Sequence, residues 1–261
     1  MIRAHGLQNY GNTCFLNSSL QVLMACDSVH TTSSPLSSFA LPYKSGLGDP
    51  RVPQTQVMER FPEFRNNFQH DAHEWTLRML EILEESKLTD AFDGTFHVTV
   101  AFPDCSHINR HNETFRSLSV DIPQNGKDFD AALHSIGMPE DVESCCDTCN
   151  DGKRKRAVKS MVITKWPRHL IIHWKRFGNN GRKISTRIPT PLAFKHYELV
   201  GMVNHAGRSP ESGHYTACVR CPDRNWWLCN DARTASIEAK HALKASEMAY
   251  MTVWTNKFEK N

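Results

Sequence analysis

The stretch from residue 6 to residue 23 reads G-L-Q-N-Y-G-N-T-C-F-L-N-S-S-L-Q-V-L and constrains this chain most, because it places a cysteine where a turn gives way to a helix. Apolar residues recur after the cysteine at helical spacing, which predicts a helix with one buried face. Cys14 then lies near the amino end of that helix, where unpaired N–H groups can lower a thiol pKa from about 8.5 towards neutrality. We therefore predict that Cys14 is a nucleophile.

A side-chain amide lies close to this cysteine in the sequence. Asn9 precedes Cys14 by five residues, and Gly6 and Gly11 give the intervening turn its conformational freedom. An amide N–H beside a nucleophile is what a developing oxyanion requires. We therefore expect Asn9 to stabilise an oxyanion.

A base and a residue to orient it occur much later in the chain. His214 follows Gly213 in S-G-H-Y, at the start of a predicted strand with β-branched and aromatic residues. Asn230 and Asp231 end a short apolar strand in W-W-L-C-N-D, and either could accept a hydrogen bond from the imidazole. Cysteine, histidine and asparagine or aspartate, far apart in sequence, are the parts of a cysteine protease.

These motifs together resemble the catalytic domain of the ubiquitin-specific proteases, a papain-like family of deubiquitinating enzymes. The resemblance covers nearly the whole chain, and its motifs occur in the family's order. Besides the first box, S-G-H-Y and W-x-x-C-N-D, the matching segments are Gln69-His70-Asp71-Ala72-His73-Glu74-Trp75, Phe92-Asp93-Gly94, F-R-S-L-S-V-D-I-P from residue 115, and I-H-W-K-R-F from residue 172.

The resemblance implies an α+β fold of the papain-like type in one catalytic domain over residues 1–261. A helical thumb would cover residues 1–90, β fingers 91–160 and a β-sheet palm 161–261. We expect helix from Gln69 to Glu85 and a loop from Thr31 to Pro53, where serine, proline and glycine are frequent.

The implied reaction is hydrolysis of the peptide or isopeptide bond after the C-terminal glycine of ubiquitin. Cys14 would attack the carbonyl, His214 would carry the proton, Asn230 would orient the imidazole, and Asp231 would be its neighbour and substitute. Asn9 would stabilise the oxyanion. The residues that the resemblance implies for substrate binding are Gln69, Asp71, Gly213 and Tyr215.

The family often carries two C-x-x-C pairs that bind a structural zinc at the fingertip, although catalysis requires no cofactor. Here the second pair is intact as Cys146 and Cys149, but Phe102 replaces the first cysteine of the other pair and leaves Cys105 alone. His107 and Cys145 are the candidates for a fourth ligand. The alternative is a fingertip held by packing alone.

Composition agrees with a single domain, since 261 residues with 39% hydrophobic content can bury one sizeable core. The 31 basic and 28 acidic residues give a net charge of only +3, which argues against nucleic acid as the main partner. Apolar runs are too short to span a membrane, and no signal peptide is visible. We expect a monomer in a reducing compartment, the cytoplasm or the nucleus, because the chain has an odd number of cysteines and a reactive thiol.

Two other functions fit the same motifs. One keeps the chemistry but acts on another ubiquitin-like modifier, such as the interferon-induced one with two ubiquitin-like lobes. The other is a catalytically weak module that binds ubiquitin, which the presence of Cys14, His214 and Asn230 argues against.

Overall fold

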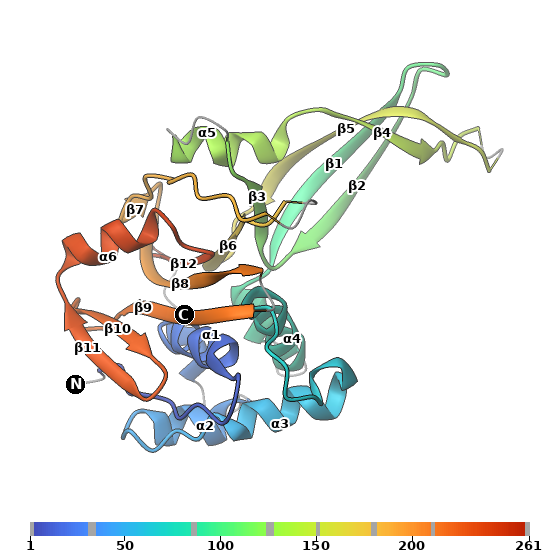
Figure 1. The fold of residues 1–261 in the computed structure, drawn as a ribbon. Coiled ribbons are helices and arrows are strands. Elements are labelled where there is room, and N and C mark those ends of the chain that lie inside the picture. Colours follow the sequence, from blue (N-terminus) through green and yellow to red (C-terminus); the bar gives the residue numbers. More distant parts are fainter. Residues whose placement is uncertain are drawn as a thin grey trace.

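We describe the fold from a computed structural model, which describes residues 3–30, 35–84, 88–123, 128–149, 152–178, 182–209 and 212–258. The first part of the chain is helical, and the rest is mainly β-structure (Figure 1). The α-helices are α1 (Cys14–Met24), α2 (Ser37–Tyr43), α3 (Arg51–Arg60), α4 (Ala72–Glu84), α5 (Phe129–His134) and α6 (Ala239–Ser246). Short 3₁₀ turns cover Asp27–His30, Pro62–Phe64, Leu88–Ala91 and Ser135–Gly137.

The predicted helix after the first box is confirmed, and it begins at Cys14 itself. Every residue of α1 is buried, because the helix packs against α4 and against two strands, β8 (Tyr197–Ser209) and β9 (Ser212–Arg220). The second predicted helix is also confirmed, although α4 begins at Ala72 rather than at Gln69. Its amino end is capped by Asp71, whose carboxylate Oδ1 accepts the backbone N–H of His73 at 2.6 Å and of Glu74 at 3.0 Å.

The expected loop from Thr31 to Pro53 is confirmed only in part. Residues 31–34 lie outside the described part of the chain, residues 37–43 form α2, residues 44–50 contain no helix, and α3 has already begun at Arg51. The helix α2 forms because Phe39, Ala40 and Tyr43 bury a common face in the apolar core that they share with α1 and α4. Tertiary packing here outweighs the proline, glycine and serine content.

Eight strands form the larger sheet, in the order β11-β10-β9-β8-β12-β6-β3 with β7 paired to β8. All described pairs are antiparallel except β3 with β6. The strands are β3 (Leu118–Asp121), β6 (His169–Lys175), β7 (Ala193–Phe194), β8 (Tyr197–Ser209), β9 (Ser212–Arg220), β10 (Trp226–Asn230), β11 (Arg233–Ile237) and β12 (Met251–Asn256).

A second sheet of four antiparallel strands, ordered β2-β1-β5-β4, extends away from the rest of the molecule (Figure 1). Its strands are β1 (Gly94–Phe102), β2 (His107–Phe115), β4 (Glu140–Cys145) and β5 (Arg154–Lys165). Alternate residues of β1 are buried from Phe96 to Phe102, so one face of this sheet is apolar. The expected α+β fold is therefore confirmed. Within the part of the chain that the structure describes, no helix combines the length and apolar character needed to cross a membrane.

Candidate active site

Cys14 lies at the junction of the helical part and the larger sheet. It opens α1, and its side chain is buried, with 3% of the residue exposed. Three backbone N–H groups face the thiol, those of Cys14, Phe15 and Tyr215, and each lowers its pKa. Burial has the larger effect, however, so the pKa of Cys14 is raised. The expectation of a lowered thiol pKa is wrong in this arrangement, because desolvation outweighs the helix terminus.

His214 belongs to β9 and precedes Tyr215, whose backbone faces the thiol. Its Nε2 lies 2.7 Å from Oδ1 of Asn230 at the end of β10. Because that amide oxygen accepts the bond, Nε2 carries the hydrogen and Nδ1 is left as the basic nitrogen. Neighbouring strands thus bring the two predicted residues together, and Asn230 holds one tautomer of the imidazole.

Asp231 follows Asn230 but faces another part of the site. Its backbone adopts a left-handed conformation with φ of 48°, and its carboxylate accepts hydrogen bonds from Asn9 at 2.9 Å and from Asn17 at 2.8 Å. Asp231 is therefore not placed as a substitute for Asn230, as the sequence suggested. It contacts the predicted oxyanion donor instead.

The orientation of the Asn9 amide is determined by hydrogen bonds at both ends. Oδ1 accepts the backbone N–H of Gly11 at 2.9 Å, the backbone N–H of Thr13 at 3.2 Å and the Thr13 hydroxyl at 3.1 Å. Nδ2 donates one hydrogen to Asp231. Its second hydrogen has no acceptor among the contacts of the described residues. The amide therefore cannot flip without losing several bonds, and one N–H is available beside the start of α1.

Gln69 connects Cys14 to the start of β9, the strand that carries His214. Its Nε2 lies 3.5 Å from the Cys14 sulfur, and its Oε1 accepts the backbone N–H of Gly213 at 2.9 Å. Gly213 has a φ of +135°, a conformation that favours glycine. The amide of Gln69 thus bridges α1 and β9 at the site.

An open trough of about 620 Å³ lies beside these residues. It is lined by Asn12, Phe68, Gln69, His70, Asp71, Glu74, Ser212 and Gly213. Three of the four predicted substrate-binding residues line it, but Tyr215 does not. The ring of Tyr215 is buried, 4.5 Å from the ring of His205.

Sequence reasoning missed Glu74 and Phe68 as residues of the trough. Glu74 belongs to the second motif and adds a second carboxylate to that of Asp71. Phe68 immediately precedes the motif and is 74% exposed. A large exposed aromatic side chain next to a functional motif is the signal that would have identified it. The trough is suited to a segment that carries both positive charge and apolar groups.

The cysteine cluster lies at one end of the four-stranded sheet. Cys105 lies between β1 and β2, His107 is the first residue of β2, and Cys146 and Cys149 lie between β4 and β5. The potential ligand atoms of Cys105, His107, Cys146 and Cys149 all lie within 4.8 Å of one another. The Cys146 sulfur is 3.7 Å from that of Cys105 and 3.4 Å from Nδ1 of His107. Tetrahedral zinc with bonds of about 2.3 Å to sulfur requires ligand separations of about 3.8 Å.

These residues fit a structural zinc of the Cys₃His type. Ser106 has a left-handed φ of 56°, which lets Cys105 and His107 approach the same point despite their short spacing. A hydrogen bond from the Cys149 backbone, the largest of several effects, lowers the pKa of Cys146 to about 6 and favours the thiolate that zinc binds. His107 is thus the fourth member of the cluster, whereas Cys145 is exposed and outside it. The cluster takes no part in the arrangement around Cys14.

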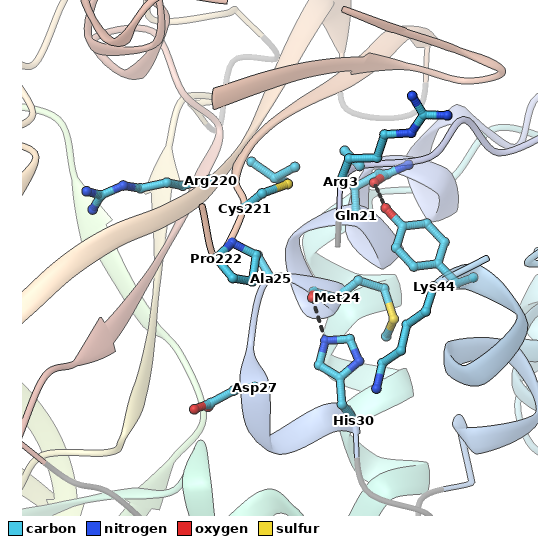
Figure 2. Close-up of a pocket in the computed structure, with 13 residues that line it drawn as sticks. Arg3, Gln21, Met24, Ala25, Asp27, His30, Lys44, Arg220, Cys221 and Pro222 are labelled. Carbon is cyan, nitrogen blue, oxygen red and sulfur yellow. Dashed lines mark hydrogen bonds between the residues drawn. The ribbon is translucent and has the colours of Figure 1, made fainter. Parts of the chain in front are cut away.

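A separate cavity of about 210 Å³ lies at the carboxyl end of α1, opposite Cys14 (Figure 2). Met24 and Ala25 from the end of α1 and Cys221 and Pro222 from the end of β9 form part of its wall. His30 lies against the same helix end and contacts the Met24 carbonyl at 2.8 Å. None of the predicted site residues lines this cavity.

Comparison with known proteins gives a family for the chain. Residues 5–254 match the family model described as ubiquitin carboxyl-terminal hydrolase. The chain is 27% identical to ubiquitin carboxyl-terminal hydrolase 23 of Arabidopsis thaliana over 94% of its own length, but it spans only 35% of that relative. It is 26% identical to ubiquitin carboxyl-terminal hydrolase 12 of Salmo salar, covering 90% of this chain and 82% of that one. Hydrolase 4 of Arabidopsis thaliana is also 26% identical, with 93% and 87% covered.

Solved structures support the same fold. The SAGA DUB module Ubp8/Sgf11/Sus1/Sgf73, bound to monoubiquitin, contains a chain that matches this one with a TM-score of 0.78 at 23% identity, covering 100% of this chain and 71% of that one. The same module bound to ubiquitin aldehyde gives a TM-score of 0.75 at 22% identity, with the same coverage. Since the family model matches all but the ends of the sequence, the chain belongs to the ubiquitin carboxyl-terminal hydrolase family.

Proposed function

We propose that the protein is a thiol-dependent deubiquitinase that cleaves the bond after the C-terminal glycine of ubiquitin. The observation that carries this proposal is the convergence of Cys14, the His214–Asn230 pair and the oriented amide of Asn9 at one site. The relatives are named for hydrolysis at the carboxyl terminus of ubiquitin, and the solved neighbours hold ubiquitin or its aldehyde.

The reaction begins when His214 removes the proton from Cys14. Nδ1 is the nitrogen for this transfer, since Nε2 is bonded to Asn230. Because burial raises the pKa of Cys14, the thiol depends on His214 to take its proton. The sulfur then attacks the glycine carbonyl, and the free N–H of Asn9 stabilises the oxyanion.

Collapse of the tetrahedral intermediate releases the amine, which takes its proton from His214, and leaves a thioester on Cys14. Water, activated by the same histidine, hydrolyses the thioester. Asp71 and Glu74 are placed to bind cationic side chains of the modifier's tail in the trough. Gly213 and Ser212 line the same trough and suit a tail that ends in glycine.

We also infer the division into a thumb over residues 1–90, fingers over 91–160 and a palm over 161–261. Helices α1 to α4 precede residue 90, and the four-stranded sheet lies between residues 94 and 165. β3 belongs to the finger range but pairs with β6 of the larger sheet. All nine cysteines are free, which supports a reducing compartment, the cytoplasm or the nucleus, and we propose a monomer there that does not bind nucleic acid.

Covalent trapping tests the proposal. Ubiquitin with a C-terminal propargylamide is expected to add its mass to the wild-type protein and not to Cys14→Ala. Cys145→Ser is the matched control, because Cys145 is an exposed thiol outside the site, and it should be trapped like the wild type. Trapping by the two-lobed modifier alone would transfer the proposal to that substrate. A folded protein trapped by neither would overturn it and favour a binding module.

A further inference from the structure

His205 of β8 is buried next to the site, although the mechanism above does not use it. Only 7% of the residue is exposed, and its ring lies among the rings of Phe177, Tyr215 and Tyr250 at centroid distances of 5.5, 4.5 and 6.3 Å. An ionisable ring in such surroundings requires a structural or functional reason.

Lys183 determines which ring nitrogen carries the proton. Its ammonium group donates to the His205 carbonyl at 2.5 Å and lies 3.4 Å from Nδ1. An ammonium group can only donate hydrogen bonds, so Nδ1 of His205 is the acceptor and Nε2 carries the hydrogen. Burial, and then the charge of Lys183, lower the pKa of His205 to about 4, so the ring is neutral near neutral pH.

The N–H at Nε2 faces the start of β9, immediately before His214. A Cβ atom on Gly213 would lie 2.9 Å from Nε2, and one on Gly207 would lie 2.7 Å from the adjacent ring carbon. Nε2 is buried and makes no hydrogen bond of standard geometry with the described residues. The backbone of Ser212 raises the pKa of the ring, against the larger effects of burial and of the Lys183 charge. The imidazole thus lies directly against the peptide groups of residues 212 and 213.

The start of β9 is linked to the nucleophile. The backbone N–H of Gly213 donates to Oε1 of Gln69, and this bond orients the amide so that its Nε2 faces the Cys14 sulfur at 3.5 Å. Displacement of Gly213 would release the amide and remove an N–H from the sulfur, where it stabilises the thiolate.

We propose that His205, held by Lys183, is a positioning residue that keeps Ser212 and Gly213 at the start of β9 in place and thereby aims the Gln69 amide at Cys14. Its effect on turnover rests on the proposed function, but its effect on the reactivity of the thiol does not.

Two substitutions separate the N–H group from the packing of the ring. His205→Phe keeps an aromatic ring among Phe177, Tyr215 and Tyr250 but has no N–H, whereas His205→Gln keeps an N–H at similar reach. The readout is the rate at which iodoacetamide alkylates Cys14 at pH 8, followed by peptide mass spectrometry. We expect His205→Phe to lower the rate about threefold to tenfold, the effect of losing the one hydrogen bond from the Gln69 amide to the Cys14 sulfur. His205→Gln should retain it to within about twofold.

A double variant tests the route through Gln69. Gln69→Leu should lower the alkylation rate by a similar factor, and adding His205→Phe should lower it no further, because both remove the same contact. An unchanged rate in His205→Phe would overturn the proposal. Equal losses in the Phe and Gln variants, together with a lower melting temperature, would also overturn it and assign the residue to packing.

The same proteins are assayed for cleavage of a fluorogenic ubiquitin substrate. A fall in kcat with unchanged KM in His205→Phe is expected if the amide acts on the sulfur. If the variants show the predicted alkylation pattern but the wild-type protein does not cleave the ubiquitin substrate, the proposed function is wrong and the positioning role still holds.

Discussion

The side-chain amide of Asn9 donates to Oδ2 of Asp231 at 2.9 Å, although 222 residues separate them. The other carboxylate oxygen accepts the amide of Asn17 from α1 at 2.8 Å. Asp231 therefore ties the segment before Cys14 to the helix that begins with it. Asn230 contacts His214. Two consecutive residues therefore support different parts of the site, Asn230 the base and Asp231 the oxyanion donor.

Replacement of Asp231 by asparagine is expected to impair the oxyanion donor. The new side chain keeps one carboxamide oxygen, and its NH₂ group can only donate, so the hydrogen bond from either Asn9 or Asn17 is lost. We expect kcat for the ubiquitin substrate to fall about 10- to 100-fold and KM to change little, because the interaction forms in the transition state. Asp223→Asn removes a charge from the turn before β10 and should leave kcat unchanged. A raised KM with normal kcat in Asp231→Asn would contradict this role.

The pH dependence of Cys14 reactivity should reflect its burial. Because burial raises the pKa of the thiol above its ordinary value of about 8.5, the thiolate fraction increases as pH rises through that raised pKa. The rate of alkylation of Cys14 by iodoacetamide should therefore still be increasing at pH 9. A plateau between pH 6 and 7 would reveal a stable thiolate–imidazolium pair and contradict the raised pKa.

His173 should make the fold sensitive to acid. Its ring stacks on that of His73 with centroids 4.0 Å apart, and burial, followed by the charges of His73 and Lys175, lowers its pKa to about 2. The unfolded chain takes up a proton near pH 6.5 that the folded ring does not, so the free energy of unfolding decreases as pH falls below about 6.5.

Urea unfolding at pH 7, 6 and 5 measures this contribution. His173→Asn, which retains a polar group opposite Ser119, should reduce the slope of the unfolding free energy against pH by about 1 kcal/mol per unit in the acidic range. An identical slope in wild type and variant would show that His173 accepts a proton in the folded state.

The cluster around Cys146 is expected to bind one zinc ion per chain. Removal of the ion with a chelator should lower the melting temperature by several degrees, because the ion holds the two turns at one end of the four-stranded sheet. His107→Ala should lower the zinc content measured by plasma mass spectrometry, whereas Cys145→Ser should not, since Cys145 lies outside the cluster. Purified protein without zinc and with a chelator-insensitive melting temperature would favour a fingertip held by packing alone.

The identity of the candidate site could be predicted from sequence because its residues lie within short motifs. Cys14, Asn9, His214 and Asn230 each belong to a segment whose local pattern predicts a turn, a helix start or a strand end. The α+β class was implied by the family resemblance that these motifs carry. Burial of the apolar face of α4 was likewise visible in its periodicity.

Other features depended on contacts between distant segments. The helix α2 forms in a stretch rich in turn residues because its apolar face is covered by the core. His107 joins the zinc cluster because Ser106 adopts a left-handed conformation, which its residue type does not predict.

Which residues bear the chemistry could be seen in the primary structure, because nucleophile, base and amide are properties of residue types in local motifs. What each of them contacts depends on the folded arrangement. It directed Asp231 to Asn9 rather than to His214, and it buried Cys14 enough that desolvation outweighs the helix terminus. Such outcomes depend on three-dimensional distances and on the exclusion of water, which no local pattern encodes.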